Sequence, residues 1–189
     1  GMDRCLNRSG PTLIVLAEHK APVYSKQGLK LMTSTMRRPS PDVLDPKIHH
    51  ANLLNSILAK IQANAAGADD AIMLDARGFI AETNATHLFL VQASLVRTPT
   101  VAACPEGITR ATVLGLCRTH AIAHEIGDLS LAELYRADEA FCTGTMGELA
   151  GITEVDGRRI GDGTIGPMTR RLSALYAECT AAGGTRVVE

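Results

Sequence analysis

Residues able to bind an anion are grouped in the segment "PEGITRATVLGL" (105–116). Gly107, Ile108 and Thr109 stand where a helix is expected to begin. The first N–H groups of a helix have no partner within it, so with the helix dipole and the Thr109 hydroxyl they can bind a phosphate. An ordinary helix start, in which Gly107 only shapes the turn, explains the same residues, and spacing alone favours that simpler interpretation.

A second anion-binding pattern is found in "FCTGTMGE" (141–148). An expected strand ends here in Thr143, Gly144 and Thr145. The hydroxyl groups can donate to an anion, and a glycine lets the backbone approach it closely. The pattern is weak on its own, because many strands end in threonine and glycine.

A third candidate is the carboxylate of Glu82, in "GFIAETNATHLFLV" (78–91). Glu82 ends an apolar run and is followed by a small polar segment that includes Thr86. A carboxylate at this place can pair with a protonated ring nitrogen and keep an electron-sink cofactor cationic. The alternative is a surface glutamate at the end of a strand, which is the more common case.

A primary amine and two imidazoles lie in "DPKIHHANLLNSILAKIQANAAG" (45–67), on the approach to an expected helix. They are Lys47, His49 and His50. A lysine amine can form a covalent bond with a carbonyl carbon. Imidazole has no primary amine, although it can transfer a proton near neutral pH.

The hydrophobic pattern predicts the elements that must position these groups. Strands are expected at 12–18, 29–35, 70–83 (two runs around Arg77-Gly78), 87–99 (a hairpin), 123–129, 139–145 and 152–163 (a hairpin at Asp156-Gly157). Helices are expected at 52–66, 108–120, 130–137, where Ser130 and Glu133 form a capping box, and from Pro167 onward. Strands outnumber helices and mostly form hairpins, which predicts an α+β fold.

Composition excludes several classes of function. The chain has 189 residues, a formal net charge of −1 and 46% hydrophobic residues, with no basic face for nucleic acid and no apolar run long enough for a membrane span. Its five cysteines are scattered without a CxxC pair, so we expect free thiols in a cytoplasmic setting. The spacing also argues against a structural zinc site, and no metal ligands are predicted.

Taken together, the motifs resemble the fold-type IV, pyridoxal-phosphate-dependent aminotransferases. This family includes the branched-chain and D-amino acid aminotransferases, with aminodeoxychorismate lyase as a cousin. The resemblance runs from about residue 30 to the end of the chain. It is carried, in this order, by "NLLNSILAKIQANAAGADDAIMLDARGFIAET", "LFLV", "TP", "GITR", "ADEAFCTGTMGE" and "VDGRRIGDGTIGPMTRRL".

The resemblance implies a role for each candidate residue. Glu82 matches the acid that faces the pyridine nitrogen of pyridoxal 5′-phosphate, and Thr86 lies in the segment that lines the cofactor's edge. The cofactor phosphate would contact two segments, through Ile108 and Thr109 and through Gly144 and Thr145.

The implied activity is transfer of an amino group from an amino acid to a 2-oxo acid, in a homodimer. Two alternatives stay open: a degenerate, non-catalytic relative that keeps the fold with or without an anion site, and a lyase of the aminodeoxychorismate type. Residues 1–36 are expected to be a remnant of a small N-terminal domain, 37–46 a linker, and 47–189 the large C-terminal domain.

The sequence departs from the family pattern in length and at the cofactor-binding lysine. Relatives have a longer segment before this point, so we expect an N-terminally truncated member. Many of them have the lysine three residues before an asparagine, and counting back from Asn52 gives His49. Branched-chain members space it one residue wider, at Ile48, while Lys47 takes the place of a flanking basic residue. Residues two apart on a strand face the same side about 6–7 Å apart, within a lysine's reach, so Lys47 and His49 are the catalytic candidates, with the cofactor bound covalently, non-covalently or not at all.

Overall fold

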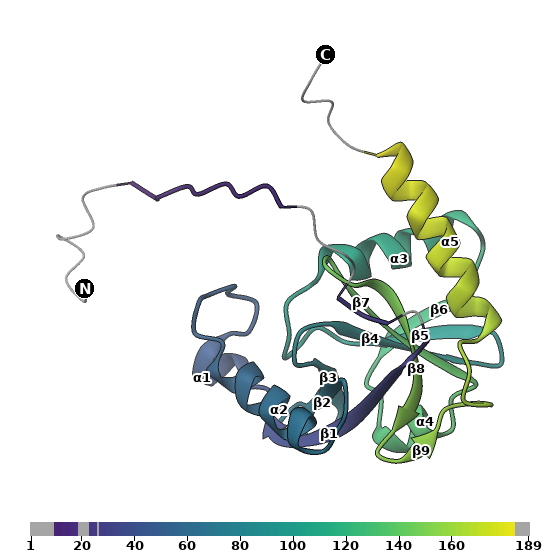
Figure 1. Cartoon of the computed structure of the whole chain (residues 1–189), viewed down its shortest axis with the longest axis horizontal. Coiled ribbons are helices and arrows are strands. Elements are labelled where there is room, and N and C mark those ends of the chain that lie inside the picture. Colours follow the sequence, from purple (N-terminus) through teal and green to yellow (C-terminus); the bar gives the residue numbers. More distant parts are fainter. Residues whose placement is uncertain (1–9, 19–22, 26, 184–189) are drawn as a thin grey trace.

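The computed structural model describes residues 10–18, 23–25 and 27–183, and these build a mixed sheet flanked by helices (Figure 1). The order in the sheet is β3-β2-β1-β8-β7-β4-β5-β6, with β9 paired to β8. The strands are β1 (Leu29–Arg37), β2 (Asp70–Leu74), β3 (Ile80–Thr83), β4 (His87–Gln92), β5 (Leu95–Pro99), β6 (His124–Gly127), β7 (Glu139–Gly144), β8 (Glu148–Val155) and β9 (Arg158–Arg159).

Most neighbouring strands are antiparallel, as the hairpin pattern predicts, but the β5–β6 pair and both pairs formed by β1 are parallel. Strand β1 lies inside the sheet, between β2 and β8, with Leu31 opposite Asp70 and Leu29 opposite Ile152. Residues 29–36 are expected from the sequence to belong to a small-domain remnant. The boundary predicted at residue 36 therefore does not coincide with a break in the sheet.

Two groups of helices flank the sheet at different places (Figure 1). The short α1 (Pro41–Leu44) leads to α2 (Leu54–Ala65), which packs on β1 and β2. Helix α3 (Ile108–Thr119) contacts α5 (Pro167–Ala182), and both contact β7. Helix α4 (Leu131–Tyr135) opens with the predicted capping box, in which Ser130 and Glu133 each accept from the other's backbone N–H.

The large side chains of α2 do not form its buried face. The helix buries the small residues Ala59 and Ala63 against Ala71 and Met73. Its Leu54, Ile57, Leu58 and Ile61 are exposed. Because these buried side chains are small, the helix can approach the sheet closely. Its larger apolar side chains form an exposed face on the opposite side.

The centre of the fold is apolar on both faces of the sheet. One cluster joins β1, β2, β4 and β8 through residues such as Leu29, Ile72 and Leu88. On the other face, Phe89 and Phe141 stack with ring centroids 4.9 Å apart, beneath α3 and α5. This core fixes the start of β4, from which the candidate site is built.

The strand predicted at 12–18 is wrong. Its residues lie outside the sheet, and Leu13, Ile14, Val15 and Leu16 are exposed. An apolar run forms a strand only where a neighbouring strand accepts its hydrogen bonds, and none of the strands in the described part of the chain pairs with this run. No helix among the described residues has the length and apolarity of a membrane span. The expected features of residues 1–9, including the Cys5 thiol, lie outside the described part of the chain.

Candidate functional site

A buried ion pair lies at the centre of the candidate site. Glu82, on β3, is only 5% exposed, and its carboxylate pairs with the guanidinium of Arg38, which directly follows β1. Arg38 is fixed by two further bonds: Nη1 donates to the Ser56 hydroxyl at 3.0 Å and Nε donates to the Ala103 carbonyl at 3.3 Å. The strand pair β1–β2 and the hairpin β2–β3 bring these two residues together from distant parts of the sequence.

Burial changes the protonation of Glu82. Desolvation raises the pKa of its carboxyl group to about 7, and the nearby charge of Arg38 acts in the opposite direction. A carboxyl group with this pKa exchanges a proton readily near neutral pH. It is therefore suited to share a proton with a ring nitrogen.

His87 and Cys104 stand beside Glu82. His87 Nε2 is 4.0 Å from Glu82 Oε2 and donates to the Pro105 carbonyl at 2.7 Å. Burial lowers the pKa of His87, so the ring is neutral and Nδ1 keeps its lone pair. Burial also raises the pKa of the Cys104 thiol to about 12, with a further increase from the negative Glu82.

The start of α3 presents backbone donors next to His87. Gly107 is the N-cap residue, with φ of +73°, and no side chain caps the helix. A Cβ at Gly107 would overlap the His87 ring. Thr109 is buried and Ile108 exposed at the first turn. The open helix end predicted from "GITR" is therefore present, and glycine is required there by both its backbone angle and the close approach.

The segment Thr143–Thr145 lies next to Thr86, the residue before His87. A Cβ at Gly144 would lie 2.9 Å from the Thr86 methyl carbon. The Thr86 hydroxyl is 2.7 Å from the Thr83 hydroxyl, while the buried Thr143 hydroxyl has no partner among the described residues. Thr145 is exposed in the turn that leads to β8. Both predicted anion-binding segments thus converge on the start of β4.

The two catalytic candidates lie on the loop between α1 and α2, and both are exposed. Lys47 donates its backbone N–H to Asp45 at 3.0 Å. Its positive charge contributes to lowering the pKa of Cys104, against the larger effect of burial, so it acts on the Glu82 cluster. Among the described residues, no side-chain hydrogen bond or ion pair holds His49 in place. The structure therefore relates Lys47 to the cluster electrostatically and leaves His49 at the surface.

Lys60, on α2, pairs with a buried carboxylate. Its Nζ pairs with Asp70 Oδ1 at 2.9 Å and also donates to the Asp69 carbonyl. The side chain bends back from α2 because the carboxylate of Asp70 is buried and lies nearby. Lys60 is therefore occupied in a structural ion pair.

Sequence reasoning misses Arg38, His87 and Cys104. Arg38 lies in the proline-rich segment interpreted as a linker, although a buried Glu82 calls for a nearby cation. His87 directly follows the predicted segment, and its facing glycine in "PEGITR" is the only sequence signal for it. Cys104 has no local signal in the sequence, because its position beside Glu82 depends on tertiary structure.

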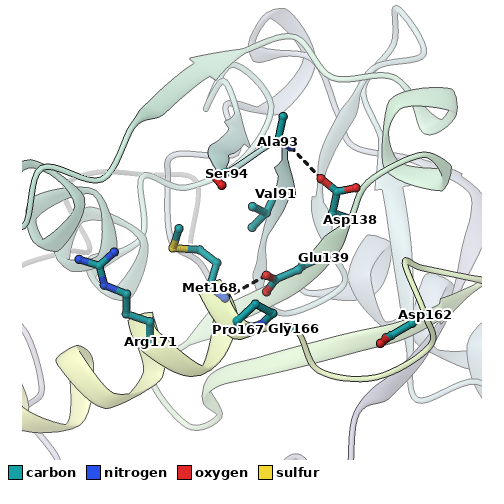
Figure 2. A pocket seen from close by; sticks show the side chains of 10 residues that line it. All are labelled: Val91, Ala93, Ser94, Asp138, Glu139, Asp162, Gly166, Pro167, Met168 and Arg171. Carbon is teal, nitrogen blue, oxygen red and sulfur yellow. Dashed lines mark hydrogen bonds between the residues drawn. The ribbon is translucent and has the colours of Figure 1, made fainter.

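A separate cavity of about 420 Å³ lies toward the other end of β4, at the start of α5 (Figure 2). Its carboxylates are already used in structure: Asp138 accepts from the Ala93 N–H at 2.7 Å, and Glu139 accepts from the Met168 and Thr169 N–H groups. The cavity is lined by Val91, Ala93, Ser94, Asp138, Glu139, Asp162, Gly166, Pro167, Met168 and Arg171. These contacts give it a structural role, distinct from the cluster around Glu82.

Comparison with known proteins gives a consistent result. The chain is 52% identical over 188 residues to the branched-chain-amino-acid aminotransferase-like protein 2 of Arabidopsis thaliana, covering 99% of this chain and 34% of that protein. It is 37% identical over 180 residues to a putative branched-chain-amino-acid aminotransferase of Methanocaldococcus jannaschii, covering 95% and 62%.

Among solved structures, the branched-chain amino acid aminotransferase of Thermobaculum terrenum in its PLP-form matches with a TM-score of 0.79 and 34% identity. The match covers 82% of this chain and 52% of that one. The chain therefore spans about a third of the Arabidopsis relative and about half of this structure. The family model for amino-transferase class IV matches residues 4–155. On this evidence, and with the site geometry described above, the chain belongs to the class IV aminotransferase family.

Proposed function

We propose that this chain binds pyridoxal 5′-phosphate and takes part in transferring an amino group from an amino acid to a 2-oxo acid. The observation that carries the proposal is the position of Glu82, a buried carboxyl group with a pKa near neutrality. It lies beside His87, whose ring contacts the uncapped start of α3. The PLP-form of the Thermobaculum terrenum relative supports the same cofactor.

The residues fit the two ends of such a cofactor. At the phosphate end, the free N–H groups of α3 and the Thr109 hydroxyl donate to the anion, and Gly144 and Thr145 approach from the β7–β8 turn. At the ring end, Glu82 would hold the proton of the pyridine nitrogen, in place of its present ion pair with Arg38. Thr86 would line the edge of the cofactor. When bound, the cofactor supplies an electron sink for negative charge at the substrate's α-carbon.

Lys47 supplies the amine in this proposal. The charge of Lys47 acts on the cluster, whereas Lys60 is held by Asp70. An uncharged lysine amine near the α-carbon can also accept the proton that leaves it. The exposed His49 would take a supporting part in moving protons.

The test is to trap the cofactor on the chain. Purified protein is incubated with pyridoxal 5′-phosphate, reduced with borohydride and digested, and the modified peptide is identified by mass spectrometry. We expect the adduct on Lys47, its loss in Lys47→Arg, and its retention in the matched control Lys60→Arg. Amino transfer from a panel of L- and D-amino acids to a 2-oxo acid is then measured with the same variants.

Two outcomes contradict different parts of the proposal. If no lysine carries an adduct, covalent cofactor chemistry by this chain is ruled out. If the adduct survives in Lys47→Arg, the choice of lysine is wrong while the cofactor assignment stands.

A second candidate function is a non-catalytic relative that binds the cofactor or another anion without covalent attachment. Two observations favour it: the exposed His49 at the position where many relatives have lysine, and the occupation of Glu82 by Arg38. This candidate predicts that pyridoxal 5′-phosphate binds reversibly, with competition by inorganic phosphate, and leaves no adduct after reduction.

We also propose that the chain works as a homodimer in the cytoplasm. The exposed apolar face of α2 supports association with a second copy. The four described cysteines are free thiols, three of them buried, which is typical of a reducing compartment. Amino acids and 2-oxo acids would be its small-molecule partners.

A further inference from the structure

The turn between β7 and β8 is held on two sides. Residues 144–147 form a tight turn, which a hydrogen bond of 3.2 Å from the Gly147 N–H to the Gly144 carbonyl closes. Thr145 occupies a central position of this turn, so the place of its hydroxyl depends on how the turn is fixed. On one side, Gly144 lies against the Thr86 methyl group. The contacts on the other side come from a segment much earlier in the chain.

Two adjacent residues, Val23 and Tyr24, make this second set of contacts. The Tyr24 ring lies so close to Gly147 that a Cβ added there would overlap the ring carbons. The Val23 N–H donates to the Met146 carbonyl at 3.3 Å. The last two residues of the turn are therefore held from outside the sheet, and a glycine at position 147 is what allows the ring to approach this closely.

The Tyr24 ring is itself fixed at its far end. Its hydroxyl donates to the carboxylate of Asp70, which is buried at the start of β2 and also pairs with Lys60. Burial raises the pKa of Tyr24 well above its usual range, and the hydrogen bond to Asp70 adds to this effect, so the hydroxyl stays protonated and remains a donor. Moving the ring away from Gly147 would therefore leave a buried carboxylate with one donor fewer.

The backbone at the end of the turn indicates a fixed conformation. Glu148, the first residue of β8, has a φ of +53°, in the left-handed region. A residue other than glycine keeps such an angle only where its surroundings determine it. The contacts of Tyr24 on Gly147, directly before Glu148, supply such a constraint.

We propose that Tyr24 is a positioning residue for the anion-binding turn and sets the place of Thr145 through its contact with Gly147. The proposal rests on the proposed function, in which Thr145 approaches the cofactor phosphate. The donors of a binding site have to be held within about 0.5 Å by side chains that packing and hydrogen bonds fix in turn. Tyr24 has both kinds of support, and it acts on the phosphate end without touching the cofactor.

Tyr135 provides a matched control for this role. It is half-buried like Tyr24, it packs against the same apolar cluster, and its hydroxyl donates to the Asp156 carboxylate at 2.7 Å. Asp156 follows the far end of β8, whereas the turn precedes the start of that strand. A Tyr135 variant therefore loses a comparable tyrosine–aspartate bond at a distance from the turn.

The experiment measures binding of inorganic phosphate and of pyridoxal 5′-phosphate by isothermal titration calorimetry. Tyr24→Ala should weaken phosphate binding by about 10–100-fold, the range found when a supporting partner is lost at metal sites. Tyr24→Phe keeps the ring over Gly147 and should retain most of the affinity. Tyr135→Ala should bind phosphate like the wild type, although urea unfolding should show a loss of stability in both alanine variants.

Amide hydrogen exchange measures the turn without any ligand. Exchange at the Gly147 N–H should become faster in Tyr24→Ala and stay unchanged in Tyr135→Ala, because only the first variant removes the contact on the turn. Circular dichroism checks that each variant is folded. If Tyr24→Ala does not fold, Tyr24→Leu, which removes the ring but keeps an apolar side chain, replaces it.

The outcomes separate the two proposals. If the wild type binds neither anion, the proposed function fails, and the role of Tyr24 in anion binding fails with it. If the wild type binds phosphate and a folded Tyr24→Ala chain binds it equally well, only the role of Tyr24 is overturned. The same conclusion follows if Tyr24→Phe loses as much affinity as Tyr24→Ala, or if exchange at Gly147 does not change.

Discussion

Burial of the Glu82 carboxyl group disfavours its charged form. The pKa of this group is about 7 in the folded chain, raised from 4.5 by desolvation in spite of Arg38. Below pH 4.5 the carboxyl group is protonated in both the folded and unfolded states, and it adds nothing to the pH dependence of stability. Between pH 4.5 and 7 the folded state binds the proton more tightly, so the free energy of unfolding falls as pH rises. Above pH 7 the full cost of the buried charge is present.

The Glu82→Gln variant removes this titration. The difference in free energy of unfolding, variant minus wild type, should increase by roughly 3 kcal/mol between pH 4.5 and pH 8. Its absolute value also includes the loss of a partner for Arg38, so the slope with pH is the decisive quantity. Urea unfolding of both proteins at pH 4.5, 6 and 8 measures it.

Glu125→Gln serves as the control for this experiment, because the side chain of Glu125 is 52% exposed. The control should show little of the pH-dependent difference. Parallel stability curves for wild type and Glu82→Gln would show that the buried carboxyl group does not titrate as described.

At the scale of elements, the start of α3 depends on close contact between its N-cap glycine and β4. Gly107 and Gly78 both have positive φ, of +73° and +91°, but only Gly107 faces a side chain, the His87 ring. Alanine at either position incurs the left-handed backbone cost of roughly 1–2 kcal/mol. At Gly107 it must also displace the ring, at a further cost of roughly 1–3 kcal/mol.

The free energy of unfolding should therefore fall more in Gly107→Ala than in Gly78→Ala, as measured by urea unfolding. The NMR resonances of the His87 ring should shift in the first variant and stay in place in the second. Equal losses of stability with an unmoved ring would contradict the packing of Gly107 on His87.

Elements defined by neighbouring residues could be predicted from the sequence. Asp156 and Gly157 both adopt positive φ, as the predicted Asp-Gly turn requires, and Ser130 with Glu133 forms the predicted capping box. The position of β1 between β2 and β8 could not be predicted, because it depends on partners about 40 and 120 residues away. A strand's local pattern does not specify its partners, and Leu13–Leu16, which lie outside the sheet in spite of their strand-like pattern, show the same limitation.

The candidate site divides in the same way. Glu82, Gly107 and Thr109 could be selected because each stands at a recognisable strand end or helix start. Arg38 and Cys104 could not be selected, because they reach Glu82 through the fold from segments without a local signal. The roles of Lys47 and His49 stay predictions.

At the scale of the whole molecule, the exposed apolar side chains gather on one side of α2. Ile57 is 51% exposed and Ile61 55% exposed on α2, and Val43 on α1 is also exposed. The two helices follow one another on the same side of the sheet (Figure 1). The net charge of the chain is only −1, so repulsion between copies is weak. An apolar helix face that meets its own copy can form a symmetric dimer.

Combining Ile57→Glu with Ile61→Glu should convert such a dimer to a monomer, because it places like charges opposite each other across the two-fold axis. The expected change is a halving of the mass measured by light scattering on a sizing column, with the circular dichroism spectrum retained. Ile126→Glu, at a 50% exposed position on β6, should leave the dimer intact. A wild-type chain that elutes as a monomer would rule out the dimer. If the double variant stays dimeric, the contact lies elsewhere, and the exposed run Leu13–Leu16 is the next surface to test.

The two isoleucines are suited to this test because they are exposed, while Ala59 and Ala63 form the buried face of α2. A loss of association is therefore separable from a loss of folding.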